Sequence, residues 1–263
     1  YWIQIIFYTI SITFVFAIFS KSSVNLSDWF SALTPISHGQ YWYMSCYFGL
    51  VLIAPFLNQA VLTLKKEQLL PIVSGAFIYF SVIPTVFKQD ILGLWGGYSV
   101  LWMILLYTIG AIIRKSNYES RFQLRNVSGF ILFLTSLTFI LCWLGFEQWR
   151  SYISPTVTLQ GIAIFLLFLN IKDIPLTFKR LVLLISPLTL GVYLFHVHPL
   201  IFRRIIPTIH TLVEEQEFPI FVIMILVMTL ALFFSGAMIE YFRNKLMAYI
   251  LTLIKSVKNL KQT

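Results

Sequence analysis

The stretch FPIFVIMILVMTLALFFSGAMIEYF, residues 218–242, decides the fold class of this chain. Glu240 is the only charged residue in it and is expected to pair with Arg243, three residues further along the same helix. The other positions are almost all large and apolar. A helix needs roughly 20 such residues to cross the ~30 Å hydrocarbon core of a bilayer. The stretch is therefore predicted to span a membrane.

The rest of the chain has the same character. Of its 263 residues, 59% are hydrophobic and 11% charged, against roughly 45–50% and 25% in a soluble domain. The same length rule finds eight candidate spans: Tyr1 to Phe19, Tyr41 to Leu62, Leu69 to Phe87, Tyr98 to Ile113, Val127 to Phe146, Thr156 to Ile171, Leu181 to Phe202 and Phe218 to Phe242. We predict an all-α, polytopic membrane helical bundle of about eight transmembrane helices, two of them short, and the bilayer as its first partner.

Basic residues orient this bundle. Eight crossings place fourteen of the 19 Lys and Arg residues on the side of Tyr1. Because cytoplasmic loops carry an excess of Lys and Arg, both ends are expected in the cytoplasm of a multi-pass cell membrane protein, expected to be bacterial. The formal charge of +9 thus reflects topology, and no nucleic acid partner is expected.

A basic tail follows the last span. Residues 245–263 combine Leu246, Ile250 and Leu253 with Lys255 and Lys258. This pattern predicts a cytoplasmic amphipathic helix on the anionic inner leaflet, after a membrane domain over residues 1–244.

The segment SPLTLGVYLFHVHPLIFRR, residues 186–204, carries the most informative polar side chains. On one continuous helix, steps of three and four residues place Thr189, Tyr193, His196 and Arg203 on one face, with His198 turned away. Such a stripe favours an outward-facing cavity in which His196 exchanges a proton near neutral pH. The alternative is that His196 packs between helices.

Two further patches are candidates for binding. Trp42, Ser45 and Gly49 share one face of the span that begins at Tyr41, which suits either a substrate or a neighbouring helix. The inner loop from Arg114 to Arg125 holds four basic residues that either meet the phosphates of coenzyme A or obey the positive-inside rule: Arg114, Lys115, Arg121 and Arg125.

The sequence motifs that are typical of metal sites, nucleotide hydrolysis, serine hydrolases and zinc proteases are missing from this sequence. The two cysteines, Cys46 and Cys142, have no CxxC or His-rich neighbourhood, so no metal site is expected. The sequence also contains no glycine-rich phosphate loop, GxSxG elbow or HExxH motif.

At two segments the chain resembles the acyltransferase-3 family of polytopic membrane proteins. Residues 41–58, YWYMSCYFGLVLIAPFLN, resemble the family's aromatic-rich helix that ends in a Pro and a polar residue. Residues 191–199, GVYLFHVHP, resemble the late helix with a Gly, Tyr, Leu, His and Pro pattern.

The resemblance implies transfer of an acyl group, most often acetyl, from acetyl-CoA to a hydroxyl of a surface polysaccharide or related glycan. Acetyl-CoA would be a donor substrate, with no permanently bound cofactor. His196 and Tyr193 would be auxiliary catalytic residues, and Trp42, Ser45 and Arg203 would contact the acceptor.

Family members usually have about ten core helices, so an N-terminal truncation of two helices is expected. The family's primary pair, a basic residue about ten positions before a His, has no counterpart here, because no Lys or Arg precedes Lys21 and no His precedes His38. This chain alone is therefore expected to be inactive. A transporter or flippase of a lipid-linked glycan, and a noncatalytic membrane scaffold, remain alternatives that share the helix count.

Overall fold

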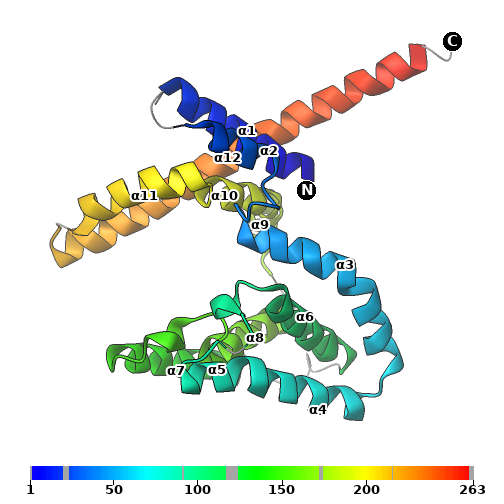
Figure 1. Ribbon diagram of the computed structural model, residues 1–263, viewed down its shortest axis with the longest axis vertical. Coiled ribbons are helices and arrows are strands. Elements are labelled where there is room, and N and C mark those ends of the chain that lie inside the picture. Colours follow the sequence, from blue (N-terminus) through cyan, green and yellow to red (C-terminus); the bar gives the residue numbers. More distant parts are fainter. Residues whose placement is uncertain are drawn as a thin grey trace. The chain divides into compact units, whose positions relative to one another are not determined.

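The computed structural model describes residues 2–19, 24–90, 92–116, 124–171, 174–214 and 216–260. Within these ranges every regular element is a helix, and the all-α prediction is confirmed (Figure 1). Contacts between elements divide the chain into two compact units. Unit 1 comprises Tyr1–Tyr41 with Pro175–Thr263, and unit 2 comprises Trp42–Ile174.

Seven helical stretches in the described ranges are long and apolar enough to cross a membrane. They are Trp2–Phe19, Trp42–Thr63, Lys66–Phe87, Arg125–Trp143, Glu147–Asn170, Leu176–His196 and Phe218–Leu253. The remaining predicted span corresponds to α6 (Val100–Lys115), whose 16 residues fall just short of the roughly 17–25 of a usual spanning helix. The polytopic membrane architecture is thus confirmed.

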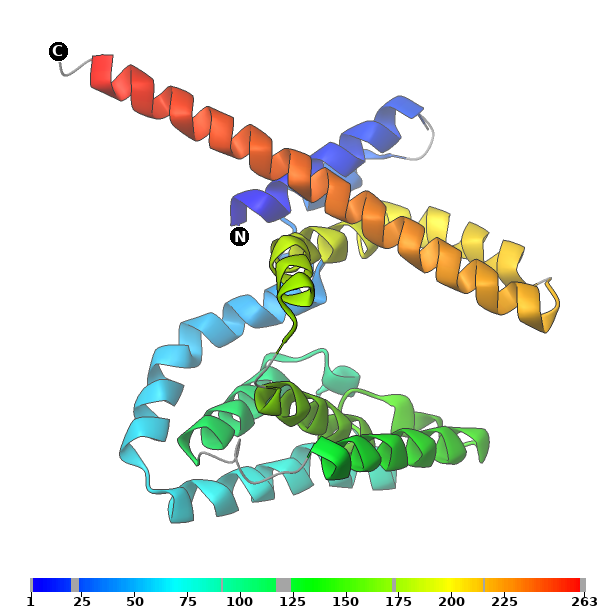
Figure 2. The same cartoon turned by 180° about the vertical axis from the view of Figure 1, so that it is seen from behind.

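Unit 1 is built from the first two helices and the last four. Its elements are α1 (Trp2–Phe19), α2 (Leu26–Leu33), α9 (Leu176–Ile185), the short helix η6 (Ser186–Leu188), α10 (Thr189–His196), α11 (Pro199–Glu214) and α12 (Phe218–Leu260). α10 packs against α12, and α11 lies alongside the N-terminal half of α12 in both views (Figures 1 and 2). α1 crosses α12 near its middle (Figure 2).

The predicted tail does not begin with a break in the helix. α12 continues from Phe218 to Leu260 as one helix of 43 residues, passing through Lys245 (Figure 2). Neither Gly nor Pro occurs between Phe242 and Leu260, so no residue interrupts the hydrogen-bonding pattern there. Lys245, Lys255 and Lys258 therefore lie on the same helix as the last span, and Lys261 lies outside the described residues. The place of this tail on the inner leaflet stays a prediction.

The single helix predicted from Leu181 to Phe202 is wrong in detail. The chain instead forms α9, η6, α10 and α11, with turns at the two prolines. Pro187 lies in η6 and Pro199 opens α11, because proline has no backbone N–H and suits the first turn of a helix. Consequently α10 ends at His196, and the predicted stripe does not continue along one helix to Arg203.

Unit 2 contains the central part of the chain. Its elements are α3 (Trp42–Thr63), α4 (Lys66–Phe77), the π-helical turn η2 (Ile78–Val82), α5 (Ile83–Phe87), the short helices η3 (Trp95–Gly97) and η5 (Glu147–Arg150), α6, α7 (Leu124–Trp143) and α8 (Pro155–Asn170). α7 packs against α8, and α6 packs against both α3 and α4. The π turn precedes Pro84, whose missing N–H accounts for the local change of pitch.

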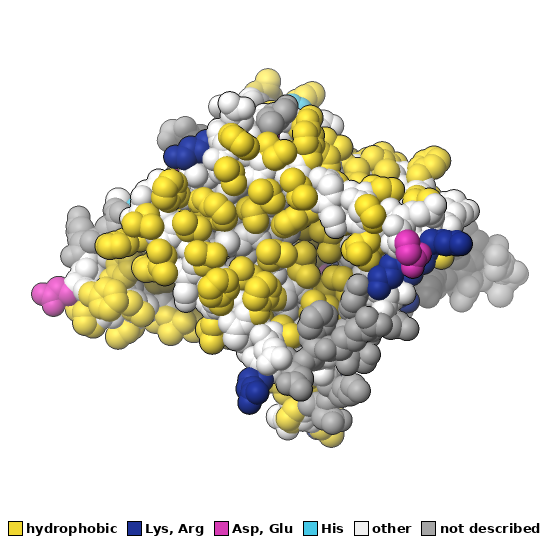
Figure 3. Space-filling model, turned by 90° about the horizontal axis from the view of Figure 1, so that it is seen from below, with side chains coloured by type: hydrophobic (Ala, Val, Ile, Leu, Met, Phe, Trp, Pro, Cys, Tyr) yellow, Lys and Arg dark blue, Asp and Glu magenta, His cyan; other side chains and the backbone are white. Residues whose placement is uncertain are grey.

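The outer surface agrees with a lipid environment. The face drawn in Figure 3 is covered mainly by hydrophobic side chains, and its charged side chains lie toward the margins. Large apolar residues are widely exposed, with Leu132 at 68%, Phe139 at 72% and Phe168 at 66%. Exposure on this scale is expected where hydrocarbon, rather than water, is the solvent.

Candidate functional site

A buried carboxylate organises unit 1. Glu240 is 1% exposed, and its two oxygens accept hydrogen bonds from Gln4 Nε2 at 3.1 Å and from Tyr8 Oη at 3.0 Å. Arg243, one turn later on α12, donates to both oxygens at 2.9 and 2.5 Å. The predicted pairing of Glu240 with Arg243 is confirmed. The carboxylate thereby joins α1 to α12 and is fully satisfied.

Two glycines allow α10 to approach this network closely. A Cβ on Gly191 would lie 2.4 Å from Glu240 Cβ and 2.5 Å from Tyr8 Oη, and a Cβ on Gly236 would lie 2.8 Å from Val192 Cα. Neither position has room for any side chain. The glycine of the GVYLFHVHP segment is thus explained by helix packing over the Glu240 network.

A chain of aromatic rings connects the two histidines of unit 1. The ring of Tyr41 lies 6.4 Å from that of His198 and 6.1 Å from that of Tyr193, and the Tyr193 ring lies 6.1 Å from that of His196. Tyr41 Oη also donates to the carbonyl of Leu194 at 2.9 Å. The histidines therefore border one cluster, although helical spacing predicts that they diverge.

His198 is the more buried histidine of the pair. It is 1% exposed, and its Nδ1 accepts the N–H of Leu200 at 3.2 Å, which caps the first turn of α11. Its Nε2 has no hydrogen-bond partner among the described residues. His196 is partly buried, and its Nδ1 lies 2.8 Å from the carbonyl of Val192 on its own helix.

Tyr193, predicted as an auxiliary catalytic residue, and Arg203, predicted to contact the acceptor, both belong to unit 1. Tyr193 lies within the ring chain of unit 1, whereas Arg203 is exposed on α11. Trp42 and Ser45 lie on the first turns of α3 in unit 2. On the same face, a Cβ on Gly49 would lie 2.8 Å from Val100 Cγ2, so this part of the stripe packs against α6.

Trp42 belongs to a three-ring aromatic cluster. Its ring lies 4.3 Å from that of Tyr98, edge to face, and 5.9 Å from that of Tyr152, while Tyr98 and Tyr152 are 5.5 Å apart. Asp90 fixes the loop before Tyr98 by accepting the N–H groups of Leu94 and Trp95, each at 2.6 Å. Clusters of this kind present flat apolar faces with polar edges.

The loop needs glycine beside this cluster. Gly97 has a φ of 110°, and a Cβ there would lie 2.6 Å from Tyr152 Cβ. Both the positive φ and the close approach disfavour every other residue. Gly97 thus permits Tyr152 to reach Trp42.

The aromatic cluster borders an apolar cavity inside unit 2. This cavity has a volume of about 630 Å³, which falls in the usual range for small-molecule sites. Its walls come mainly from α3, α6 and α8, and they include Trp42, Trp102, Leu106, Gly161, Ile162 and Phe165. We call it the apolar cavity.

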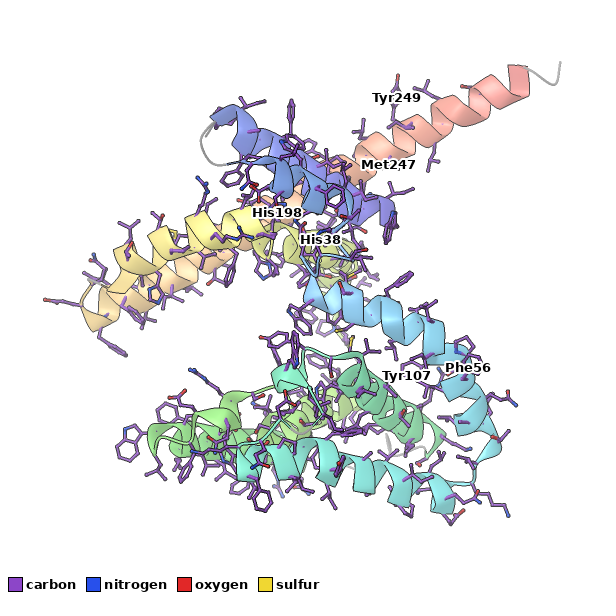
Figure 4. The ribbon with its side chains drawn as sticks, viewed as in Figure 1. His38, Phe56, Tyr107, His198, Met247 and Tyr249 are labelled. Carbon is purple, nitrogen blue, oxygen red and sulfur yellow. The ribbon has the colours of Figure 1, made fainter. Side chains whose placement is uncertain are left out.

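A second cavity adjoins the first. It has a volume of about 1120 Å³ and shares Leu106, Gly110 and Phe165 with the apolar cavity. Polar side chains line its other end, where Tyr107 Oη donates to Asn58 Oδ1 at 2.7 Å. Figure 4 shows Tyr107 on α6, close to α3. Because Arg114 and Lys115 line it as well, we call it the basic cavity.

The four basic residues predicted to meet coenzyme A have different surroundings. Arg114 is exposed at the basic cavity, and Arg125 is exposed in the first turn of α7. Lys115 Nζ donates to the carbonyls of Val61 and Leu64 at 2.5 and 2.6 Å, at the C-terminal end of α3. Arg121 lies outside the described residues.

Among the described residues, no three His, Cys, Asp or Glu side chains gather in a group that could hold a metal ion. The Glu240 network, Tyr41 and the cavities of unit 2 are features that sequence reasoning missed. Gln4 and Tyr8 share one face of the first span at a spacing of four residues, a signal that could have indicated a polar contact.

Comparison with known proteins agrees with this architecture. The model of the acyltransferase-3 family, described as an acyltransferase domain, matches residues 1–251. The chain therefore belongs to the acyltransferase-3 family and is a membrane acyltransferase. Neither the curated proteins nor the solved structures contain a significant match.

Proposed function

We propose that this protein transfers an acyl group from acyl-CoA, at the cytoplasmic face, to a hydroxyl of a surface polysaccharide or related glycan. The family match over residues 1–251 is the observation that carries this proposal. The resemblance implies acetyl as the group transferred. In the reaction, the acceptor oxygen bonds to the acyl carbon, the C–S bond of the thioester breaks, and the hydroxyl proton passes through a base to the departing thiolate.

The geometry of unit 2 supports a CoA thioester as donor. The basic cavity has the exposed guanidinium of Arg114 at one end, and guanidinium groups suit phosphates because they donate in a planar fork. Asn58 and Tyr107 supply polar atoms for the amides of the pantetheine arm. Lys115 is placed to stabilise the end of α3, so Arg114 carries more of the proposed donor binding.

An aromatic surface supports a sugar as acceptor. Trp42, Tyr98 and Tyr152 form flat apolar faces with hydroxyl groups at their edges. In unit 1, His196 is the partly buried candidate for proton transfer, beside Tyr193.

The test is acyl-ester formation on the surface glycan. Cells that make the protein should show O-acyl signals in the proton NMR spectrum of their polysaccharide, and His196→Ala should reduce them. The exposed His210 of α11 provides a control, and His210→Ala should preserve the signals. Equal signals in cells with and without the protein would contradict the proposal, and lost glycan export with normal acylation would indicate transport instead.

Donor binding is tested separately with Arg114→Gln. Loss of a phosphate contact of roughly 1.5–3 kcal/mol predicts a KM for acyl-CoA that rises at least tenfold, with little change in kcat. Arg150 is also exposed, and it pairs with Glu147 and lines neither cavity, so Arg150→Gln should leave KM unchanged. An unchanged KM in Arg114→Gln would remove Arg114 from the donor site.

A further inference from the structure

The size of the apolar cavity bears on which acyl group the donor carries. A volume of about 630 Å³ suits a ligand of many carbon atoms, because sites for drug-sized molecules span roughly 300–1,000 Å³. An acetyl group occupies only a small part of such a volume. The cavity and acetyl specificity therefore do not match.

The chemistry of the lining indicates a hydrocarbon occupant. Trp42, Trp102, Leu106, Ile162 and Phe165 contribute apolar surface, and polar atoms form only a small part of the wall. The amides of a pantetheine arm would lose hydrogen bonds to water there without replacing them, which costs of order 1–3 kcal/mol for each group. A methylene chain loses nothing by the same transfer.

The adjoining basic cavity determines where the polar part of the same molecule lies. Arg114 is two turns beyond Leu106 on α6, about 12 Å along the helix axis at ~1.5 Å per residue. The shared lining of Leu106, Gly110 and Phe165 makes the two cavities neighbours. A molecule with an anionic head at Arg114 thus extends past Gly110 into the apolar cavity.

Two glycines leave this path open. A Cβ on Gly110 or Gly161 would have no neighbouring heavy atom within 4 Å, in contrast with Gly191 and Gly236. Both glycines line the apolar cavity. A larger side chain at either position would therefore occupy space in the cavity without distorting the backbone.

We propose that the apolar cavity binds the acyl chain of the donor, that this chain is longer than acetyl, and that Gly110 and Gly161 determine the accepted length. The inference rests on the proposed function in one respect, that the donor is a CoA thioester. The nucleotide lies at Arg114, the pantetheine amides lie beside Asn58 and Tyr107, and the thioester lies near the shared residues. The hydrocarbon extends along Gly161 and Ile162 in the apolar cavity, and the faces of Trp42 and Tyr152 are left to the acceptor.

The experiment compares acetyl-, butanoyl- and octanoyl-CoA with the purified full-length protein in detergent, by kcat/KM for transfer and by calorimetric titration. Full burial predicts an affinity gain of about fourfold for each added CH2. Gly161→Leu should lower the octanoyl-to-acetyl ratio at least tenfold, and Gly110→Leu should act in the same direction. Thermal unfolding of each variant checks that it is folded.

Gly129 supplies a matched control. It lies on α7, a Cβ there would have no neighbouring heavy atom within 4 Å, and it does not line either cavity. Gly129→Leu adds the same hydrocarbon to the protein and should preserve the ratio. If Gly161→Leu still prefers octanoyl-CoA over acetyl-CoA as strongly as the unmodified protein does, the preference comes from partition of the acyl chain into detergent. That result would overturn the proposal.

The two hypotheses fail in different ways. If acetyl-CoA is transferred at least as well as octanoyl-CoA, and Gly161→Leu does not change the ratio, the acyl-length inference is wrong while the acyltransferase function stands. If no thioester is transferred, the proposed function fails, and the titration decides the site. If octanoyl-CoA still binds, and Gly161→Leu abolishes this binding while Gly129→Leu preserves it, the apolar cavity is supported as the acyl-chain site. Equal binding by the two variants would overturn the acyl-chain site.

Discussion

The interiors of unit 1 and unit 2 differ: that of unit 1 is polar and closely packed around Glu240, and that of unit 2 is apolar and contains cavities. Unit 1 buries a charged, hydrogen-bonded network around Glu240 and closes helices over it at Gly191 and Gly236. Unit 2 leaves two adjoining cavities, and glycines on α6 and α8 face open space. A buried carboxylate with all its hydrogen bonds made favours a single arrangement of the helices around it. Side chains that line an empty cavity lack van der Waals contacts on one side, and a bound ligand can supply those contacts.

This difference assigns separate tasks to the two units. In unit 1 the polar groups around Glu240 are occupied by one another, so we expect that network to contribute first to stability. In unit 2 the helices leave two cavities open, and ligand binding is the role that we propose for this space. Substitutions in the two interiors should therefore change the stability of the protein by different amounts.

The largest expected effect is on the Glu240 network. Glu240→Gln removes the partner of the largely buried Arg243 and should lower the free energy of unfolding by about 3 kcal/mol, since an isolated buried charge costs about 3–5 kcal/mol. Thermal and denaturant unfolding in detergent measure this change.

The exposed pair Glu147 and Arg150 is the control for that variant. It has the same three-residue spacing, with side chains 64% and 75% exposed. Glu147→Gln should cost less than about 1 kcal/mol, as surface pairs do. Equal losses of unfolding free energy in Glu240→Gln and Glu147→Gln would show that the buried pair stabilises the protein no more than the exposed pair does.

An intermediate effect is expected from glycine substitutions. Gly191→Ala places a methyl group against Glu240 and Tyr8 and should destabilise the protein by about 1–3 kcal/mol. Gly161→Ala has no such contact and should be neutral or stabilising by up to about 1 kcal/mol, because alanine favours the helix. The same unfolding measurement compares them, and a reversed order would contradict the distinction between the closed and the open interior.

The smallest effect is expected at the end of α3. Lys115→Met removes a cation that donates to the carbonyls of Val61 and Leu64 and should cost about 0.5–1 kcal/mol. Lys179, exposed on α9, serves for comparison, and Lys179→Met should change stability by less than about 0.5 kcal/mol. No difference between the two variants would mean that Lys115 does not stabilise α3.

Much of the fold could be predicted from local patterns. Apolar length identified the spanning segments, because each must satisfy its own backbone in hydrocarbon. The pairing of Glu240 with Arg243 also followed from spacing within one helix. Prediction was least accurate between Leu181 and Phe202, where Pro187 and Pro199 end one helix and begin another. The expected face of His196 and Arg203 depended on a helix that does not continue.

The candidate site was less accessible to sequence reasoning. Tyr8 meets Glu240 across a separation of 232 residues, and Tyr41 meets the backbone of Leu194 across 153. The roles expected for His196, Tyr193, Trp42, Ser45, Arg203 and the basic loop remain predictions. Arg114 and Lys115 both line the basic cavity, and Lys115 also donates hydrogen bonds to the C-terminal end of α3.

The sequence by itself determined the solvent of this protein, its helical class and its family resemblance. The membrane solvent and the helical class follow from composition and short-range periodicity, whereas the family resemblance lies in the motifs of residues 41–58 and 191–199. Tertiary structure alone decided which carboxylate is buried, which glycines are closed and which are open, and where empty volume lies. Such properties depend on how distant helices pack, and no local pattern specifies the shape that remains between them.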